Sequence, residues 1–350
     1  MSSTFGTLLK LSTFGESHGE GVGVILEGVS PGLELHEEDI QKELDRRKPG
    51  QSDIATPRKE SDTVHILSGV FEGKTTGTPL MMLLYNSDIQ SKDYNSIKDY
   101  FRPGHADFTY LQKYGFRDWR GSGRASGRET AARVAAGAVA KKILSKKGVR
   151  IIAYTYEAGG IACKSIDTTV IEKNPMRAAD MDAAAQMLER GLALKKEQNS
   201  MGGIITCIIQ GVRAGIGEPV FDKLDALLSH AIMSIGAVKG IEFGSGFAAS
   251  KMTGREHNDA MTAKGFDSNN AGGILGGIST GENIIIRIAV KPVSSIASPQ
   301  NTLSITGVES VISTEGRHDI CICPRIIPVV EAMSALVLGD LYKRHEALFI

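Results

Sequence analysis

An internal repeat limits the possible fold of this chain more than any other feature of its sequence. The segment GVGVILEGVSPGLELHEEDIQKELDRR near the start aligns with GIITCIIQGVRAGIGEPVFDKLDALL near the middle. Each copy has the pattern of a strand, a glycine turn and a helix, and each leads into a further predicted strand, VHILSGVFEG or VKGIEFGSGF. The matched pairs are Gly28 and Gly211, Val29 and Val212, Gly32 and Gly215, Asp39 and Asp222, and Leu44 and Leu227.

The repeat predicts two related strand-helix-strand halves, at about residues 6–150 and 200–340. Chance similarity of two apolar segments is the alternative interpretation. In the first copy, we expect the strand to run through Val29 and the helix to begin near Glu37. Further strands are predicted in PLMMLLYN, VRIIAYTYEA and NIIIRIAVK, and further helices at residues 128–147, 177–198, 218–234 and 328–345.

The chain is expected to fold as a single large domain of the α+β class, with layered sheets and helices. Its 350 residues, 41% of them hydrophobic, can supply a sizeable core, and no proline-rich or serine-rich linker divides them. The sequence contains no GxGxxG that opens a helix after a strand and no GxxxxGK[ST]. These absences argue against a Rossmann domain and a P-loop.

A helix rich in small residues follows a run of arginines in WRGSGRASGRETAARVAAGAVAKKILSKKG. Ser126 and Glu129 have the spacing of a capping box, and the alanine-rich face would let another backbone pack closely. A helix N-terminus and arginine side chains both bind phosphate or carboxylate, so the segment predicts an anion site. A solvated basic face is the alternative. The arginines are Arg102, Arg117, Arg120, Arg124, Arg128 and Arg133.

The charge composition argues against nucleic-acid and membrane partners. Lysine and arginine total 40, as do aspartate and glutamate, so the whole molecule has no bulk attraction for polyanions. An aromatic content of 6% also disfavours a surface that stacks bases. No apolar run reaches the roughly 18 residues of a membrane span, and no signal-peptide pattern is present, so we expect a cytoplasmic protein.

The cysteines predict neither a disulfide framework nor a metal site. They are few and scattered, and the closely spaced pair lacks the partners of a structural zinc site. We therefore expect reduced, buried thiols and no bound metal. The four cysteines are Cys163, Cys207, Cys321 and Cys323.

Three histidines lie in turn-like segments rather than on periodic apolar faces. His18 lies in TFGESHGEGVG, His105 in FRPGHADF, and His318 precedes Asp319 in GRHD. A single loop histidine is commonly inert, but three beside an arginine cluster favour acid-base chemistry on a phosphorylated or carboxylated small molecule. A phosphotransferase would need a nucleotide loop or magnesium-binding carboxylates, and neither pattern is found.

Six motifs resemble those of the chorismate synthase family: FGESHG, FRPGHAD, GSGRASGRETAARVAAGAVA, NNAGGILGGISTG, KPVSSI and GRHDICICPRIIPVVEAMSALVL. They occur in the family's order and spacing from about Gly6 to Leu338. One such motif would be weak, whereas six in register are highly specific. The resemblance implies a single-domain β-α-β sandwich with internal pseudo-twofold symmetry, in agreement with the repeat.

The resemblance also implies the last step of the shikimate pathway. In that step, 5-enolpyruvylshikimate 3-phosphate loses phosphate by a 1,4-trans elimination and becomes chorismate. The reaction needs reduced FMN although it is redox-neutral, because the flavin lends an electron and recovers it. The alternative is another FMN- or phosphate-binding enzyme that acts on a small anionic metabolite.

The site residues follow from the resemblance position by position. His18 is similar to the histidine that protonates the reduced flavin, with Ser17 as its relay neighbour. His105 resembles the histidine that protonates the departing phosphate, and Asp319 the aspartate that, through flavin N5, helps to remove the ring proton. Arg47 is expected to contact a substrate or nicotinamide phosphate. Flavin contacts are implied for Arg124, Ala125, Ser126, Gly236, Ala237, Gly276, Lys291, Pro292, Val293, Ser294, Ser295 and Arg317.

Two positions depart from the family pattern. Relatives often have arginine where this chain has Asp53, so the pocket either lacks one positive charge or receives it from Arg58 or Lys59. Some relatives have asparagine where this chain has Gly236, which argues against a side-chain contact there.

The resemblance implies a homotetramer as well. Some members, mainly fungal, reduce their own flavin with NADPH, but this chain has the compact length of members that depend on an external flavin reductase or reductant. We therefore expect no intrinsic NADPH oxidation.

Overall fold

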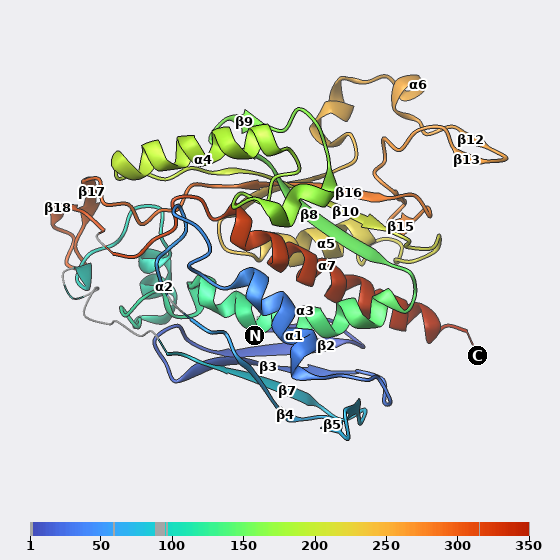
Figure 1. The fold of residues 1–350 in the computed structure, drawn as a ribbon, viewed down its shortest axis with the longest axis horizontal. Helices are drawn as coiled ribbons and strands as arrows, with labels where there is room; N and C mark the ends of the chain where they lie inside the picture. The colour runs from blue at the N-terminus through green and yellow to red at the C-terminus, as the bar shows by residue number, and fades with distance from the viewer. Residues whose placement is uncertain (1–2, 59, 88–94, 96, 315, 350) are drawn as a thin grey trace.

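Two antiparallel five-stranded sheets enclose a layer of helices in the part of the chain that the structure describes (Figure 1). This computed structural model describes residues 3–58, 60–87, 95, 97–314 and 316–349. The first sheet has the order β1 (Thr4–Phe5), β2 (Lys10–Gly15), β3 (Gly21–Glu27), β7 (Leu80–Tyr85) and β4 (Val64–Ser68). The second has the order β11 (Val238–Phe243), β16 (Ile284–Val290), β10 (Gly203–Gln210), β8 (Arg150–Ala158) and β9 (Ile161–Ala162).

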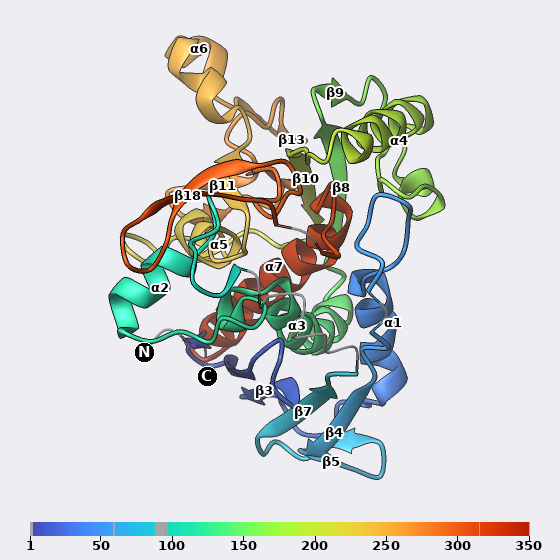
Figure 2. The same ribbon diagram turned by 90° about the vertical axis from the view of Figure 1, so that its left-hand side faces the viewer.

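The longer helices are α1 (Glu37–Arg47), α2 (Asp107–Tyr114), α3 (Thr130–Ser145), α4 (Met181–Lys196), α5 (Leu224–Met233) and α7 (Cys323–Glu346). Helices α1, α3, α5 and α7 lie between the sheets, as both ribbon views show (Figures 1 and 2). The single-turn α6 (Gly254–His257) and the hairpin β12 (Met261–Thr262) to β13 (Gly265–Phe266) project away from these layers (Figure 1).

Short 3-10 helices and hairpins complete the described chain. The 3-10 helices are η2 (Gly123–Ala125), η3 (Gly127–Glu129), η4 (Thr168–Lys173) and η5 (Gly246–Lys251). The remaining hairpins are β5 (Val70–Phe71) with β6 (Lys74–Thr75), β14 (Ile274–Leu275) with β15 (Ile278–Ser279), and β17 (Gln300–Leu303) with β18 (Glu309–Ile312).

The two halves of the described chain have the same order of elements. The elements β2, β3, α1, β4, β7 and α3 of the first half correspond to β8, β10, α5, β11, β16 and α7 of the second, and both sheets join these strands in the same spatial order. The matched glycines have the same role. Gly28 and Gly211 have φ of 82° and 74°, and an added Cβ would lie 1.7 Å from the Leu8 carbonyl oxygen and 2.2 Å from that of Gly148. Only glycine fits such a close approach.

The helix layer is held together by close contact between α3 and α7. Alternate residues of the strands, such as Val22, Val24 and Leu26 in β3, are buried against it. A Cβ on Gly137 of α3 would lie 2.3 Å from the Cβ of Ala332 in α7, so the two backbones approach as the small-residue face of α3 predicted. Helix α3 contacts the first sheet and α7 the second, and together they form the centre of the sandwich.

Helix α7 begins at Cys323, five residues earlier than predicted, and has Pro328 in its interior. Pro324 suits the first turn of this helix because it has no N–H to leave unpaired. Pro328 cannot donate a hydrogen bond to the carbonyl four residues earlier, which belongs to Pro324. The Nη1 of Arg177 donates to that carbonyl instead, at 2.7 Å, so the helix continues through the proline without an orphaned acceptor.

Several other predicted boundaries were wrong by a few residues. The first-copy strand ends at Glu27 rather than at Val29, and α5 begins at Leu224 rather than at 218. Helix α4 begins at Met181 rather than at 177, because the Asp180 side chain caps it by accepting from the backbone N–H groups of Asp182 and Ala183.

The predicted capping box before α3 was also wrong. Ser126 caps the short helix η3 by accepting from the Arg128 N–H, and α3 itself begins at Thr130. The Glu129 carboxylate does not return to Ser126; it accepts from the Thr13 hydroxyl at 2.8 Å and from Arg133 Nε at 2.8 Å.

The four cysteines are free and buried, as predicted. Among the helices of the described residues, none combines the length and the apolar character needed to cross a membrane. Nor do the described histidine, cysteine, aspartate and glutamate side chains form a group that could hold a metal ion.

Candidate active site

A pocket of about 1440 Å³ opens where the segments before α3 and α7 meet those after β2, α5 and β16. The segments before α3 and α7 hold equivalent places in the two halves of the repeat. Among the described residues, ten arginines and Lys291 line the pocket together with six carboxylates. The walls therefore carry a net positive charge, which favours an anionic ligand.

The pocket gathers most of the residues that the motifs pointed to, although they lie far apart in the sequence. Two lie outside its lining. His18 packs behind the loop that carries Gly121, where an added Cβ would lie 2.5 Å from the imidazole. Gly276 lies at the turn of the β14–β15 hairpin, away from the others. The residues that line the pocket are Ser17, Arg47, His105, Arg124, Ala125, Ser126, Gly236, Ala237, Lys291, Pro292, Val293, Ser294, Ser295, Arg317 and Asp319.

His105 lies in the turn before α2, with both ring nitrogens close to polar groups. Its Nδ1 is 3.1 Å from Asp107 Oδ1, and its Nε2 is 2.9 Å from Ser122 Oγ. Burial lowers the pKa of His105, and the charges of Arg102 and Lys291 act in the same direction, while Asp107 opposes them. The imidazole is therefore more readily neutral here than in water.

Asp319 lies in the segment before α7 and is held by two donors. Its Oδ1 accepts from the Thr56 N–H at 2.9 Å, and its Oδ2 is 2.5 Å from Arg325 Nη1. Thr56 also donates its hydroxyl hydrogen to the Arg317 carbonyl at 2.8 Å. The carboxylate is thus fixed in position at the wall of the pocket.

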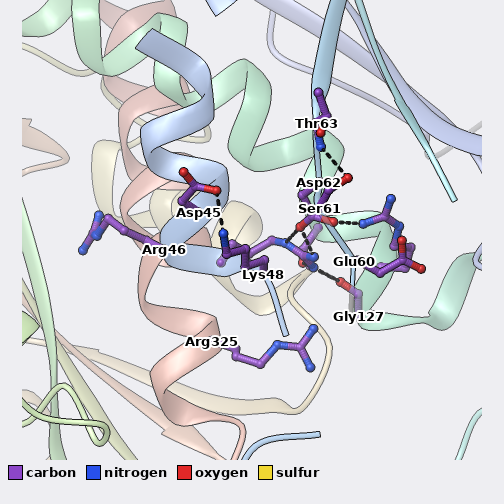
Figure 3. A network of polar contacts seen from close by, with 12 residues as sticks. Asp45, Arg46, Lys48, Glu60, Ser61, Asp62, Thr63, Gly127 and Arg325 are labelled. Atoms are coloured by element: carbon purple, nitrogen blue, oxygen red, sulfur yellow. Dashed lines mark hydrogen bonds and ion pairs between the residues drawn. The ribbon is translucent and has the colours of Figure 1, made fainter. Parts of the chain in front are cut away.

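Arg47 and Arg128 share one buried carboxylate, that of Asp62. Figure 3 shows Asp62 close to Gly127. Arg47 Nη2 lies 2.5 Å from Asp62 Oδ2, and Arg47 Nη1 donates to the Gly127 carbonyl at 3.1 Å. Burial alone would raise the pKa of Asp62, but the two arginines hold it below its ordinary value. Arg46, the neighbour of Arg47 in α1, points away from Asp62 (Figure 3). The Arg47 guanidinium is therefore engaged with protein groups at the edge of the pocket.

Sequence reasoning missed three groups that shape the pocket. Asp62 has a positive φ of 50° and lies in ESDT, which has no motif character. Asp107 lies in the motif FRPGHAD but was not among the predicted site residues; α2 begins there, and its carboxylate faces His105 and Arg102. Arg325 follows Pro324 in the first turn of α7, and an earlier predicted start of that helix would have pointed to it.

The structure shows one residue that could supply the positive charge that relatives have at the position of Asp53. The Asp53 side chain is exposed and does not line the pocket, and its carbonyl accepts from Lys195 Nζ at 2.7 Å. Arg58 does line the pocket. Lys59, the other candidate for the missing charge, lies outside the described residues.

The lowered pKa of His318 makes the stability of the protein depend on pH. Burial, then the charges of Arg58 and Arg102, lowers its pKa to about 4. Between its ordinary pKa of about 6.5 and that value, the unfolded chain binds a proton that the native chain does not, so stability falls as the pH falls. The difference corresponds to about 3 kcal/mol. In urea unfolding, His318→Gln is expected to lose less stability than the parent between neutral pH and about pH 4.5. Equal losses in both proteins would contradict this.

Comparison with known proteins agrees with the motifs and with the fold. The family model described as chorismate synthase matches residues 9–342. The chain is 53% identical over 338 residues to the chorismate synthase of Syntrophobacter fumaroxidans, an alignment that covers 97% of this chain and 96% of that one. It is 54% identical over 347 residues to that of Methanosarcina mazei, with coverage of 97% and 95%.

A solved structure supports the same assignment. A crystal structure of chorismate synthase superposes with a TM-score of 0.78 at 31% identity, and the alignment covers 97% of this chain and 93% of that one. The predicted layered α+β fold is thereby confirmed. The family match over nearly the whole length, the relatives and the shared fold lead to one conclusion: the chain belongs to the chorismate synthase family.

Proposed function

We propose that the pocket binds reduced FMN together with 5-enolpyruvylshikimate 3-phosphate and catalyses the 1,4-trans elimination of phosphate that forms chorismate. That the chain is a lyase of the chorismate synthase type follows from its family. The observation that carries the finer proposal is the convergence of the motif residues on one pocket with positively charged walls. An external reductase, a homotetrameric assembly, a cytoplasmic location and the lack of intrinsic NADPH oxidation belong to the same proposal.

The size of the pocket suits two ligands. Sites for one small molecule are usually about 300 to 1,000 Å³, whereas this pocket has about 1440 Å³. A cofactor and a substrate that react with each other must lie side by side, so a shared chamber is what the reaction requires.

The residues present fit a flavin. Gly127 and Gly236 line the pocket, and a Cβ added to either would meet nothing within 4 Å, so both leave space for a planar ring against the backbone. Ala237 has a φ of 73°, a strained value that is found mostly at functional sites. The Ser17 hydroxyl is buried and has no hydrogen-bond partner among the described residues, so it is available to a ligand.

Four segments around this space would bind the flavin. The residues that would hold the flavin are Arg124, Ala125 and Ser126 before α3, Gly236 and Ala237 after α5, Lys291 to Ser295 after β16, and Arg317 before α7. Lys291 is itself fixed, because its Nζ donates to the Gly104 carbonyl at 2.7 Å. When bound, the reduced flavin supplies an electron that assists the departure of phosphate and takes it back afterwards.

The remaining steps belong to side chains of the protein. His105 would hold a proton at Nε2 and transfer it to the departing phosphate oxygen. Asp319, held by Thr56 and Arg325, would assist removal of the ring proton. His18 and Ser17 would supply a proton close to the flavin. The positively charged walls would orient the phosphate and carboxylates of the substrate.

Titration with oxidised FMN tests this proposal against its alternatives. We expect FMN fluorescence to be quenched on binding, and 5-enolpyruvylshikimate 3-phosphate to strengthen the binding because the two molecules share one chamber. A nucleoside triphosphate at the same concentration is the matched control and should not strengthen it. An affinity for FMN that the substrate does not change, or no FMN binding at all, would contradict the proposal.

A further inference from the structure

Asp107, the first residue of α2, accepts hydrogen bonds from two arginine side chains and lies close to a ring nitrogen of His105. Arg102 donates from Nε to Oδ2 at 2.7 Å and from Nη2 to Oδ1 at 2.8 Å. Arg117 donates from Nη1 to Oδ1 at 3.2 Å. His105 Nδ1 lies 3.1 Å from the same Oδ1. The side chain of Asp107 is almost completely buried, so water cannot replace these donors.

These contacts indicate where the proton of a neutral His105 lies. Although burial would raise the pKa of Asp107, Arg102 and His105 hold it well below its ordinary value, so the carboxyl group is ionised and can only accept. Nδ1 makes no well-aligned hydrogen bond, but its 3.1 Å distance from this ionised oxygen favours a hydrogen atom on Nδ1 over a lone pair. In the neutral ring Nε2 then has a lone pair, and the Ser122 hydroxyl at 2.9 Å donates to it.

Burial, together with the positive charges nearby, lowers the pKa of His105 and so disfavours a second proton on the ring in the free protein. Arg102 and Arg117 neutralise the charge of Asp107, which would otherwise favour an imidazolium ion. Lys291 after β16 and His318 before α7 also act on the ring. Neither supplies a negative charge. A phosphate group that enters the pocket would supply one.

We propose that Asp107 is a positioning residue that holds His105 as the Nδ1–H tautomer, and that Nε2 takes up a proton from solvent only when a phosphate group enters the pocket. On that event, the Ser122 hydroxyl changes from donor to acceptor, and the imidazolium ion is ready to protonate the phosphate. The second half of this inference rests on the proposed function, whereas the tautomer does not.

Replacing Asp107 with asparagine would remove the constraint. The amide can donate to Nδ1 through its nitrogen as well as accept through its oxygen, so either tautomer can form. In the Nε2–H tautomer, the lone pair would face the amide rather than the pocket, and proton uptake at Nε2 would be lost. An aspartate that orients a catalytic histidine in hydrolase triads has the same effect when it is replaced by asparagine.

The experiment is nitrogen NMR of the full-length protein with 15N-labelled histidine, near neutral pH and without ligand. His105→Ala identifies the His105 signals. In the parent protein we expect a protonated Nδ1 and an unprotonated Nε2, and both nitrogens protonated after addition of inorganic phosphate. Ser122→Ala removes the partner of Nε2 alone, so it is the matched control and should retain the Nδ1–H tautomer. Asp107→Asn should show a mixture of tautomers or the Nε2–H form.

The parent spectrum alone can overturn the inference, so it does not depend on whether Asp107→Asn folds. An Nε2–H tautomer or an imidazolium ion in the ligand-free parent would contradict it, as would an unchanged spectrum in a folded Asp107→Asn variant. An Nδ1–H tautomer in a protein that forms no chorismate would leave the role of Asp107 intact and refute the proposed function. Chorismate formation by a protein in which His105 is the Nε2–H tautomer would support the proposed function and refute the role of Asp107.

Discussion

Replacing His105 with alanine is expected to reduce the rate of chorismate formation by roughly 10- to 10⁴-fold, the span that follows loss of a general acid. Its Nε2 lies 2.9 Å from Ser122 at the pocket wall. The nearby His318 cannot replace it, because its pKa is lowered to about 4 and it is neutral at neutral pH. His18→Ala is expected to lose activity within the same range. The measurement is anaerobic turnover with chemically reduced FMN, followed by chorismate absorbance.

Two controls separate lost chemistry from lost structure. Both variants should still bind FMN, because neither imidazole is needed to form the cavity. His257→Ala is the matched substitution, since His257 lies in α6 and does not line the pocket, and its turnover should equal that of the parent. If His105→Ala and His18→Ala both turn over at the parent rate, the roles assigned to these histidines are incorrect.

Replacing Glu331 with alanine is expected to cost about 3 to 5 kcal/mol of the free energy of unfolding, the usual effect of breaking a buried ion pair from one side. Glu331 lies in α7, and its Oε2 is 2.6 Å from Arg46 Nη1 and 2.8 Å from Lys141 Nζ. Its Oε1 accepts from the Ala153 N–H at 3.0 Å. One carboxylate thus joins α1, α3, α7 and β8. Alanine would leave Arg46 with Glu43 and Glu172, and Lys141 with Glu43.

Urea unfolding near neutral pH measures this cost, with Glu27→Ala as the control. Glu27 pairs with Lys10 at 3.7 Å, but both side chains are about half exposed, so its loss should cost less than about 1 kcal/mol. Although burial would raise the pKa of Glu331, Lys141 and Arg46 lower it to about 2. Its contribution is therefore present at neutral pH and lost as the pH falls from about 4.5 towards about 2. Equal costs for the two variants would contradict this account of Glu331.

The fold could be predicted from the sequence where the pattern is local and repeated. Alternating apolar residues identified the central strands of both sheets, and the matched glycines Gly28 and Gly211 marked the same turn in each half. The residues that form a turn, and the spacing of apolar residues along a strand or helix, are local features of the sequence. They can therefore be recognised before the fold is known.

Helix starts could not be predicted as well, because their side chains find partners far along the chain. Glu129 has the spacing of a capping residue but bonds to Thr13, 116 residues away. Pro328 looks like a helix boundary until Arg177 is seen to bind the carbonyl that it leaves unpaired.

In the candidate site, too, local motifs could be predicted and long-range contacts could not. Its motif residues could be identified one by one, but not the groups that hold them in place. Asp62 joins Arg47 and Arg128 from two separate segments, and Thr56 reaches Asp319 across 263 residues. Such pairs form only when distant segments of the chain are brought together by folding, and the sequence gives no spacing rule for them.

The most direct test is an anaerobic assay of the purified parent protein with 5-enolpyruvylshikimate 3-phosphate, with and without chemically reduced FMN. We expect chorismate to form only when reduced FMN is present, because the pocket residues bind and move protons but cannot supply an electron. Chorismate formation at the same rate in the strict absence of flavin would contradict the proposal that cofactor and substrate share this chamber.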